Sequence, residues 1–491
     1  MVQLAGRYSD GKGVPQDREQ AFQWYRRAAE LGDSRAQNYL GLHYATGRGT
    51  TQDDRAAVDW YRRSAKTGNW WGAKNLGGMY ANGEGIGKDD DEAVRWYRVA
   101  AERGLASAQH ELAFMFSSGR GLPIDAANAC HWYRLAAEQG NSSSIYNLAL
   151  LVAEGNGCEK DPEEAFRLLK QAAAKGHVSA MFQLGRKFAE GLGTAKDLQA
   201  AVHWYRQAAL HDHAQACVFL AAACIEGKGV EKSPQEGFRW CLRGAELGDQ
   251  EGCSLVSIFY LDGSHVEKNH EAAWQWAERI QDDRNWMKCV VLGDLYRAGT
   301  VVEKNSQEAL RRYRIAAEAK ILRAYTQLGL MYTIGEGTPP DLHEAFKWWE
   351  LGAQTGNATC QWALGLAYKN GRGVKVDAVK AREWLRKAAD QGEASAQISL
   401  AIMYGFGEGG AEDIPAARRL LLPLAKAGNA EAQYYLGGIC KVKGEYLEAL
   451  EWLEKAVHQE YAEAPETFAK TLTFCTDAVK DRHKENAMRY L

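Results

Sequence analysis

The chain has 491 residues, which is enough for several ordinary domains or for one long array of repeats. Hydrophobic residues make up 46% of the sequence, so we expect a buried core and no extensive disorder. The 60 basic and 63 acidic residues leave a net charge of −3, which gives no general attraction to nucleic acid or to anionic lipid. The sequence has no run of about 20 apolar residues, so direct insertion into a membrane is not expected either.

A pair of glycines separated by one residue recurs every 36 residues without insertion or deletion. The first glycine keeps this register in twelve copies, from residue 11 to residue 407, and this regularity indicates a repeat array. The pairs are Gly11/Gly13, Gly47/Gly49, Gly83/Gly85, Gly119/Gly121, Gly155/Gly157, Gly191/Gly193 and Gly227/Gly229, and the first glycine continues as Gly263, Gly299, Gly335, Gly371 and Gly407. Trp-Tyr pairs, Ala-Ala pairs and a closing glycine keep the same step, as at Trp60-Tyr61, Ala28-Ala29 and Gly68.

Within one unit the apolar residues have helical spacing. In the second copy, Ala36, Leu40 and Tyr44 fall on one face of a first helix, which the glycine pair ends. A second helix is predicted over 54–67, after the capping residue Asp53 and before the closing glycine. The sequence therefore predicts one helical hairpin per unit.

Small residues such as Gly41 and Ala57 are expected where the two helices of a hairpin cross. They let the backbones approach closely, while Trp, Tyr and Leu fill the space around them. One hairpin cannot bury its own apolar faces, so neighbouring hairpins are expected to stack into a continuous core.

Several sequence features of the unit resemble the Sel-1-like repeat, a relative of the tetratricopeptide repeat. They are its length, the Leu40-Gly41-x-x-Tyr44 of the first helix, the Gly-x-Gly loop and the Trp-Tyr-x-x-Ala-Ala of the second. The resemblance covers residues 1 to about 460. It implies an all-α, right-handed superhelical α/α solenoid of about 12–13 two-helix repeats. It also implies a non-catalytic scaffold or adaptor that binds a protein or peptide partner on a concave surface, without a cofactor or a small-molecule substrate.

The last unit differs in spacing from the others. Gly437 and Ala449 are 12 residues apart, where Gly41 and Ala57 are 16 apart, and the shorter spacing is that of a plain tetratricopeptide repeat. We therefore divide the chain into an array over 1–435, a tetratricopeptide-like last repeat over 436–460, and capping helices over 461–491 that cover the apolar end of the stack.

Two copies near 263–320 are irregular. Their loops read Gly263-Ser-His and Gly299-Thr-Val in place of Gly-x-Gly, and the closing glycine becomes Arg284 in the first of them. A functional kink in the array and simple sequence drift both explain these changes.

Cysteine usage and the N-terminus bear on where the protein works. The ten cysteines form no Cys-x-x-Cys pair and do not recur in pairs within units, which favours a reducing, cytoplasmic location. The first 13 residues lack the pattern of a secretion leader. Leu4 already belongs to the leucine column of the first helix, so we expect the natural product to extend upstream or to have lost a leader. In the second case a periplasmic or secreted location is expected.

One column of the first helices is predicted to face a partner, by analogy with tetratricopeptide proteins. It is rich in aromatic and apolar residues, which supply most of the binding energy at protein interfaces. An alternative is that these residues belong to the core. The candidate contact residues of this column are His110, Tyr146, Phe182, Trp362 and Tyr434.

Two further features are candidates for partner contact. Glu154, Glu190, Glu226 and Asp262 place one acid in each of four consecutive units, where they could receive a basic segment; the alternative is ordinary solvated charge. Trp71 lies in an inter-repeat turn, where it either meets a partner or packs over a neighbouring repeat.

Catalytic motifs are absent from the sequence. It has no Walker loop, no Gly-x-Ser-x-Gly, no His-Glu-x-x-His, and no segment outside the repeats that could house an active site. No catalytic residue, metal ligand or cofactor is predicted. The alternatives to a general scaffold are a bacterial immunity or effector-neutralising or regulatory protein that acts by binding and, less favoured, a hydrolase with its site inside the superhelix.

Overall fold

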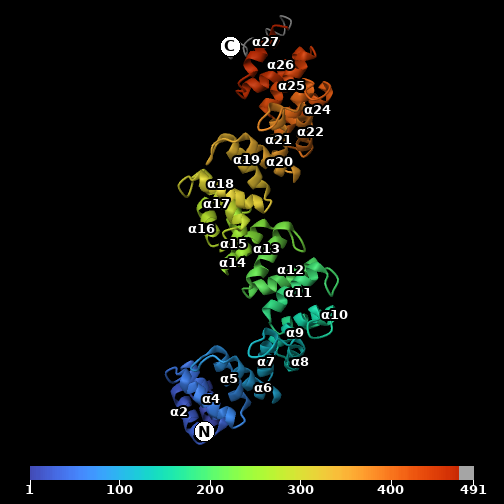
Figure 1. Ribbon diagram of the computed structural model, residues 1–491. Helices are drawn as coiled ribbons and strands as arrows, with labels where there is room; N and C mark the ends of the chain where they lie inside the picture. Colours follow the sequence, from blue (N-terminus) through green and yellow to red (C-terminus); the bar gives the residue numbers. More distant parts are fainter. Residues whose placement is uncertain (475–491) are drawn as a thin grey trace. The chain divides into compact units, whose positions relative to one another are not determined.

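The computed structural model describes residues 1–474, and within them it contains helices and no strand (Figure 1). Successive helices follow one another as antiparallel hairpins. The helices are α1 (Val2–Asp10), α2 (Arg18–Glu30), α3 (Ser34–Thr46), α4 (Asp54–Lys66), α5 (Trp70–Asn82), α6 (Asp90–Glu102), α7 (Ala106–Ser118), α8 (Ala126–Glu138), α9 (Ser142–Glu154), α10 (Pro162–Ala174), α11 (Val178–Glu190), α12 (Leu198–Leu210), α13 (Ala214–Glu226), α14 (Pro234–Glu246), α15 (Gln250–Asp262), α16 (His270–Glu278), α17 (Trp286–Ala298), α18 (Ser306–Glu318), α19 (Leu322–Ile334), α20 (Leu342–Gln354), α21 (Ala358–Asn370), α22 (Ala378–Asp390), α23 (Ala394–Gly405), α24 (Ile414–Lys426), α25 (Ala430–Val442), α26 (Tyr446–His458) and α27 (Ala464–Leu472).

The chain divides into two compact units, residues 1–252 and residues 253 onward, here called unit 1 and unit 2. In each unit the odd-numbered helices are the first helices of the hairpins, here called A helices, and the even-numbered ones are B helices. Within each unit, helices pack against the next one in the chain both within a hairpin, as α3 does on α4, and between hairpins, as α4 does on α5. The predicted all-α repeat solenoid is confirmed.

Helix boundaries follow local capping chemistry. Every B helix except α26 begins after an N-cap whose side chain accepts a backbone N–H, as Asp53 does from Ala56 at 3.0 Å. Many A helices end at a glycine in the left-handed conformation, such as Gly47 with a φ of 65°. Because these signals lie within a few residues of each boundary, the sequence predicted them correctly.

The core of each hairpin is built from the columns that the repeat defines. Leu40 and Leu76 are fully buried, as are Ala57 and Ala93 on the facing B helices. A Cβ atom at Gly41 would lie 2.7 Å from the ring of Tyr61, so the predicted close approach of the two helices is confirmed.

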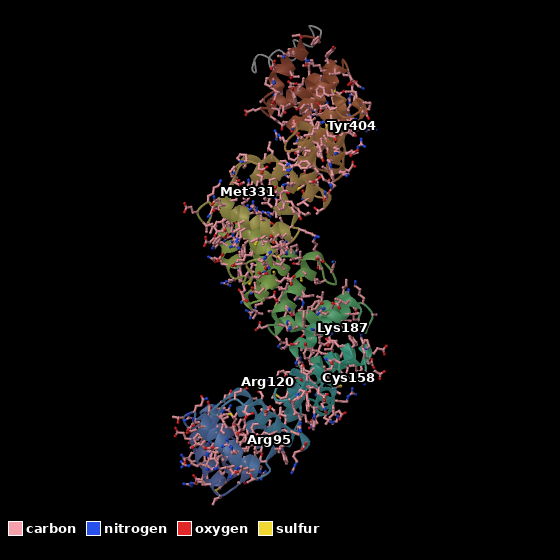
Figure 2. The ribbon with its side chains drawn as sticks, in the orientation of Figure 1. Arg95, Arg120, Cys158, Lys187, Met331 and Tyr404 are labelled. Atoms are coloured by element: carbon pink, nitrogen blue, oxygen red, sulfur yellow. The ribbon has the colours of Figure 1, made fainter. Side chains whose placement is uncertain are left out.

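From Gly49 onward, the second glycine of a Gly-x-Gly loop packs against the preceding repeat. At Gly49, with a φ of +70°, a Cβ atom would lie 2.0 Å from the carbonyl oxygen of Arg18 on the preceding B helix. In one repeat, the residue between the two glycines also contacts residues that precede it in the array. Arg120, labelled in Figure 2, donates to the Ala81 carbonyl at 2.9 Å and to the Asp90 carboxylate. The loop therefore both ends the A helix and contacts the preceding repeat.

The C-terminal end of unit 2 continues the helical stacking. α27 packs on α26, and Phe468 is buried with Leu453 and Val457 in a small cluster. This helix covers part of the segment predicted to cap the array over 461–491. The remainder of that segment, residues 475–491, lies outside the described residues.

The irregular copies also differ in structure from the other repeats. α16 has 9 residues where the other B helices of unit 2 have 13. Lys288, at a position that most repeats fill with a small residue, is buried there. Its ammonium donates to the Ile280 carbonyl at 2.9 Å and to Asp283 at 2.7 Å, so it satisfies polar groups beyond the shortened helix.

Candidate functional site

The predicted contact column lies at the border between the core and the exposed face of the A helices. His110, Tyr146, Trp362 and Tyr434 are half-buried. Phe182 is only 5% exposed and belongs to the core, which corrects the expectation that its side chain faces a partner. The structure thus supports the core alternative for this residue.

A rotation of the helices by one residue explains the difference. Phe182 on α11 stacks on His213 at 4.7 Å and meets the edge of Phe219 on α13 at 5.3 Å. Phe219 lies one position later in the repeat and is 40% exposed. One helical residue is a turn of about 100°, so an error of one position moves a side chain from the surface into the core.

Exposed aromatic side chains are distributed unevenly between the two kinds of helix. Within residues 1–474, all exposed Tyr, Trp and Phe side chains lie on A helices or directly after one. They are Tyr39, Trp70, Trp71, Phe114, Phe219, Trp286, Phe406 and Phe474. Only Trp71 among them was predicted from the sequence, and no local pattern in the sequence separates the others from buried aromatic residues. Aromatic groups left in water mark surfaces that bind other proteins.

Trp71 is the most exposed of the predicted aromatic contact residues. It lies in the first turn of α5, and half of its surface remains exposed beside the exposed Trp70. On α7, the next A helix, Phe114 is also exposed. Unit 1 therefore presents large aromatic groups on two successive A helices.

The predicted acids are exposed at the ends of their A helices, and three of them have basic partners. Glu190 pairs with Arg186 at 3.1 Å, Glu226 with Lys228 at 2.5 Å, and Asp262 of unit 2 with Arg323 at 2.7 Å. Glu154 is exposed as well. Exposed pairs of this kind contribute little energy, and a basic partner would compete with the existing cations.

Trp362 and Tyr434 lie on A helices of unit 2 and use their polar atoms within the fold. Trp362 Nε1 donates to Ser399 Oγ on α23 at 3.3 Å. Thr467 Oγ1 of α27 donates to the Tyr434 hydroxyl at 3.4 Å. Both side chains remain partly exposed.

Groups that could suggest catalysis or metal binding are engaged in structural contacts. His110 Nδ1 lies 2.9 Å from Ser144 Oγ, but Ser144 is fully buried and no substrate can reach it. Cys440, Glu445 and Glu448 lie close enough together to hold a metal ion. Arg418 occupies that position, because it donates to Glu445 at 2.6 Å and to both oxygens of Glu448. Burial and the charge of Glu448 raise the pKa of the Cys440 thiol to about 12, so the thiol stays protonated.

Two histidines of unit 1 cap A helices in the neutral form. The Nδ1 atoms of His177 and His213 accept the backbone N–H groups of Ala180 and Ala216, each at 3.3 Å. The ring of His177 stacks on Tyr146 at 4.5 Å. Burial lowers the pKa of both histidines, because it disfavours the charged ring.

We expect unit 1 to lose stability as the pH falls from 7 to 5. The pKa of each of these histidines is lower in the folded state than the unfolded value of about 6.5. The stabilisation is therefore complete above pH 6.5 and is lost as the pH drops below it, because the unfolded chain binds more protons. Protonation of Nδ1 also removes the cap. Amide hydrogen exchange in α11 and α13, corrected for intrinsic rates at each pH, measures this loss.

The matched variant is His177→Asn/His213→Asn, since asparagine caps the equivalent helix α9 at Asn141. This variant should show a smaller change in protection between pH 7 and pH 5. An equal change in the variant and the natural sequence would show that other groups cause it.

The comparisons with known proteins agree with this architecture. A family model described as Sel1 repeat matches residues 1–33, 34–69, 72–105, 106–141, 142–177, 178–213, 214–249, 250–280, 289–320, 322–357, 358–393, 394–429 and 430–461. The search of curated proteins found no match. Within residues 1–474, no helix combines the length and the apolar character needed to cross a membrane.

Solved structures show the same kind of fold. A protective antigen present in uropathogenic Escherichia coli strains is 30% identical over 93% of this chain and 98% of that one, with a TM-score of 0.74, and displays an SLR fold. A Sel1 repeat protein from Oxalobacter formigenes is 30% identical over 50% of this chain and 96% of its own, with a TM-score of 0.46. An immunity protein from Pseudomonas aeruginosa is 18% identical over 44% of this chain and 81% of its own, with a TM-score of 0.30, a likeness that carries no argument about function.

Proposed function

Because this chain belongs to the Sel1 repeat family, whose fold commonly mediates contacts between proteins, we propose that it is a non-catalytic scaffold or adaptor. It binds a partner protein or peptide on the exposed face of its A helices. The family is generally non-catalytic, and the two catalytic-looking clusters described above are closed by burial or by an arginine.

The observation that carries this proposal is the placement of the exposed aromatic side chains on the A-helix side. Trp and Tyr are enriched among the residues that dominate binding energy, and burying a large aromatic group on binding is strongly favourable. Exposed aliphatic residues such as Val99 on α6 and Leu351 on α20 lie on B helices as well, so the bias concerns aromatic groups in particular.

Affinity capture followed by mass spectrometry tests the proposal with the double variant Trp71→Ala/Phe114→Ala. Both side chains are exposed in unit 1, so their loss leaves the core intact. We expect partners that dock on unit 1 to bind at least about 30-fold more weakly, as for the loss of a hot-spot residue worth about 2 kcal/mol.

The matched control is Val99→Ala/Leu351→Ala, which trims exposed apolar groups on B helices. It should retain every partner. Equal capture by the natural protein and by both double variants would contradict a role for the A-helix aromatics. Loss of the same partners from the control variant would assign binding to the B-helix side.

A further inference from the structure

An apolar pocket opens between α23 and α25 in unit 2. Its volume is about 220 Å³, and most of its lining surface is apolar. Cofactor and drug-sized sites usually measure about 300–1,000 Å³, so this pocket suits one large side chain better than a cofactor. The residues that define its character are Ile402, Phe406, Tyr434, Tyr435 and Val442.

Two glycines on neighbouring A helices keep the pocket open. Gly405 ends α23 and Gly438 lies inside α25, and no atom lies within 4 Å of the position that a Cβ would take at either residue. At the position equivalent to Gly438, other repeats carry leucine, as at Leu42 and Leu330. The fold therefore tolerates a large side chain there, and in this repeat the space is left empty.

The rim of the pocket exposes apolar surface to water. Phe406 is 74% exposed and Val442 is 76% exposed. Covering side chains of this size lowers the free energy, because apolar surface is removed from water. An apolar group that enters the pocket and covers the rim would gain part of that energy.

Two carboxylates lie near the tyrosines that line the pocket, since burial and then the charges of Glu431 and Glu463 raise the pKa of Tyr435. Glu431 precedes Tyr434 and Tyr435 on α25, and Glu463 precedes α27, where its side chain does not cap the helix. Burial raises the pKa of Glu431, and the charge of Glu463 raises it further. Within residues 1–474, neither carboxylate forms an ion pair with a lysine or arginine. A cation from outside would relieve this repulsion.

We infer that this pocket binds a short protein segment in which a lysine or arginine stands beside a large apolar residue. The apolar side chain enters between α23 and α25, and the basic side chain meets Glu431 and Glu463. The inference rests on the proposed binding function and names the chemistry of the partner for one site. The basic residue is inferred because its charge complements the two carboxylates, and the single apolar side chain because the pocket has room for only one.

Selection of random dodecapeptides displayed on phage tests this inference with the full-length protein as bait. The variant Gly438→Leu fills the pocket, and its fold should be retained because leucine favours a helix more than glycine does. The matched control Gly78→Leu places the same side chain at the equivalent position of α5 in unit 1. Circular dichroism checks that both variants stay folded.

We expect the enriched peptides to carry a lysine or arginine within two positions of Leu, Ile, Met, Phe or Trp. Fluorescence polarisation of the enriched peptide should show at least tenfold weaker binding to Gly438→Leu and unchanged binding to Gly78→Leu. The variant Glu431→Gln/Glu463→Gln should bind about threefold to tenfold more weakly, and added salt should reduce the binding of the natural protein.

Three results would overturn the inference: enrichment without basic residues, equal binding to Gly438→Leu, or the absence of any peptide that prefers the natural protein. Capture of a partner through Trp71 and Phe114 would still support the proposed function in each of these cases. Failure of both experiments would count against the binding function itself.

Discussion

Replacing Gly49 with alanine is expected to lower the free energy of unfolding of the first repeats by about 3 kcal/mol. The residue has a φ of +70°, a conformation that costs other residues roughly 1–2 kcal/mol. The new Cβ would also lie 2.0 Å from the Arg18 carbonyl oxygen on the preceding B helix. Forcing these backbones apart adds an overpacking cost of roughly 1–3 kcal/mol. Urea unfolding and amide hydrogen exchange in α2 and α3 measure the loss.

Gly13→Ala is the matched control because a Cβ atom at Gly13 would have open space around it. Gly13 occupies the same position of the repeat with a φ of +76°, but no atom lies within 4 Å of its Cβ position. Its replacement should cost only the roughly 1–2 kcal/mol of backbone strain. The difference between the two variants isolates the contact between repeats. Equal losses would mean that the second glycine serves only the local turn.

Replacing Lys288 with methionine is expected to destabilise unit 2 by about 2–3 kcal/mol. The side chain is 7% exposed, and its ammonium is bonded to the Ile280 carbonyl and to Asp283. Methionine fills similar space but leaves the carbonyl without this donor, and hydrogen bonds to charged groups contribute about 1.5–3 kcal/mol. Urea unfolding measured by circular dichroism, together with hydrogen exchange in α17, gives the change.

Lys304→Met provides the control for the loss of a lysine charge. Lys304 is 59% exposed and pairs with Glu336, which also keeps Arg297 as a partner at 2.8 Å. Its replacement should change stability by less than about 1 kcal/mol, as for other surface pairs. A similarly small effect at Lys288 would show that the shortened helix α16 does not depend on this side chain.

The exposed face of the A helices was only partly predictable because helix rotation is a property of packing. The sequence predicted a partner-facing column on the A helices, but its aromatic residues are half-buried or, for Phe182, buried. Trp71, predicted in an inter-repeat turn, lies in the first turn of α5 and is half exposed. Phe182 and Phe219 show where the pattern was insufficient: both fit an apolar stripe, and packing against rings of α12 and α13 buries only Phe182. Helical periodicity alone leaves an uncertainty of about one residue in such a stripe.

The sequence alone determined the period, the hairpin of each repeat, the helix boundaries and the buried leucine column. Capping residues, glycines and helical spacing act over a few residues, and the same signals recur in the repeats along the chain. The tertiary structure decided the approach of Gly49 to the preceding helix, the burial of Lys288 and the pocket that Gly405 and Gly438 keep open. These features arise from contacts between different helices, and no local signal in the chain reports the distance between two such residues.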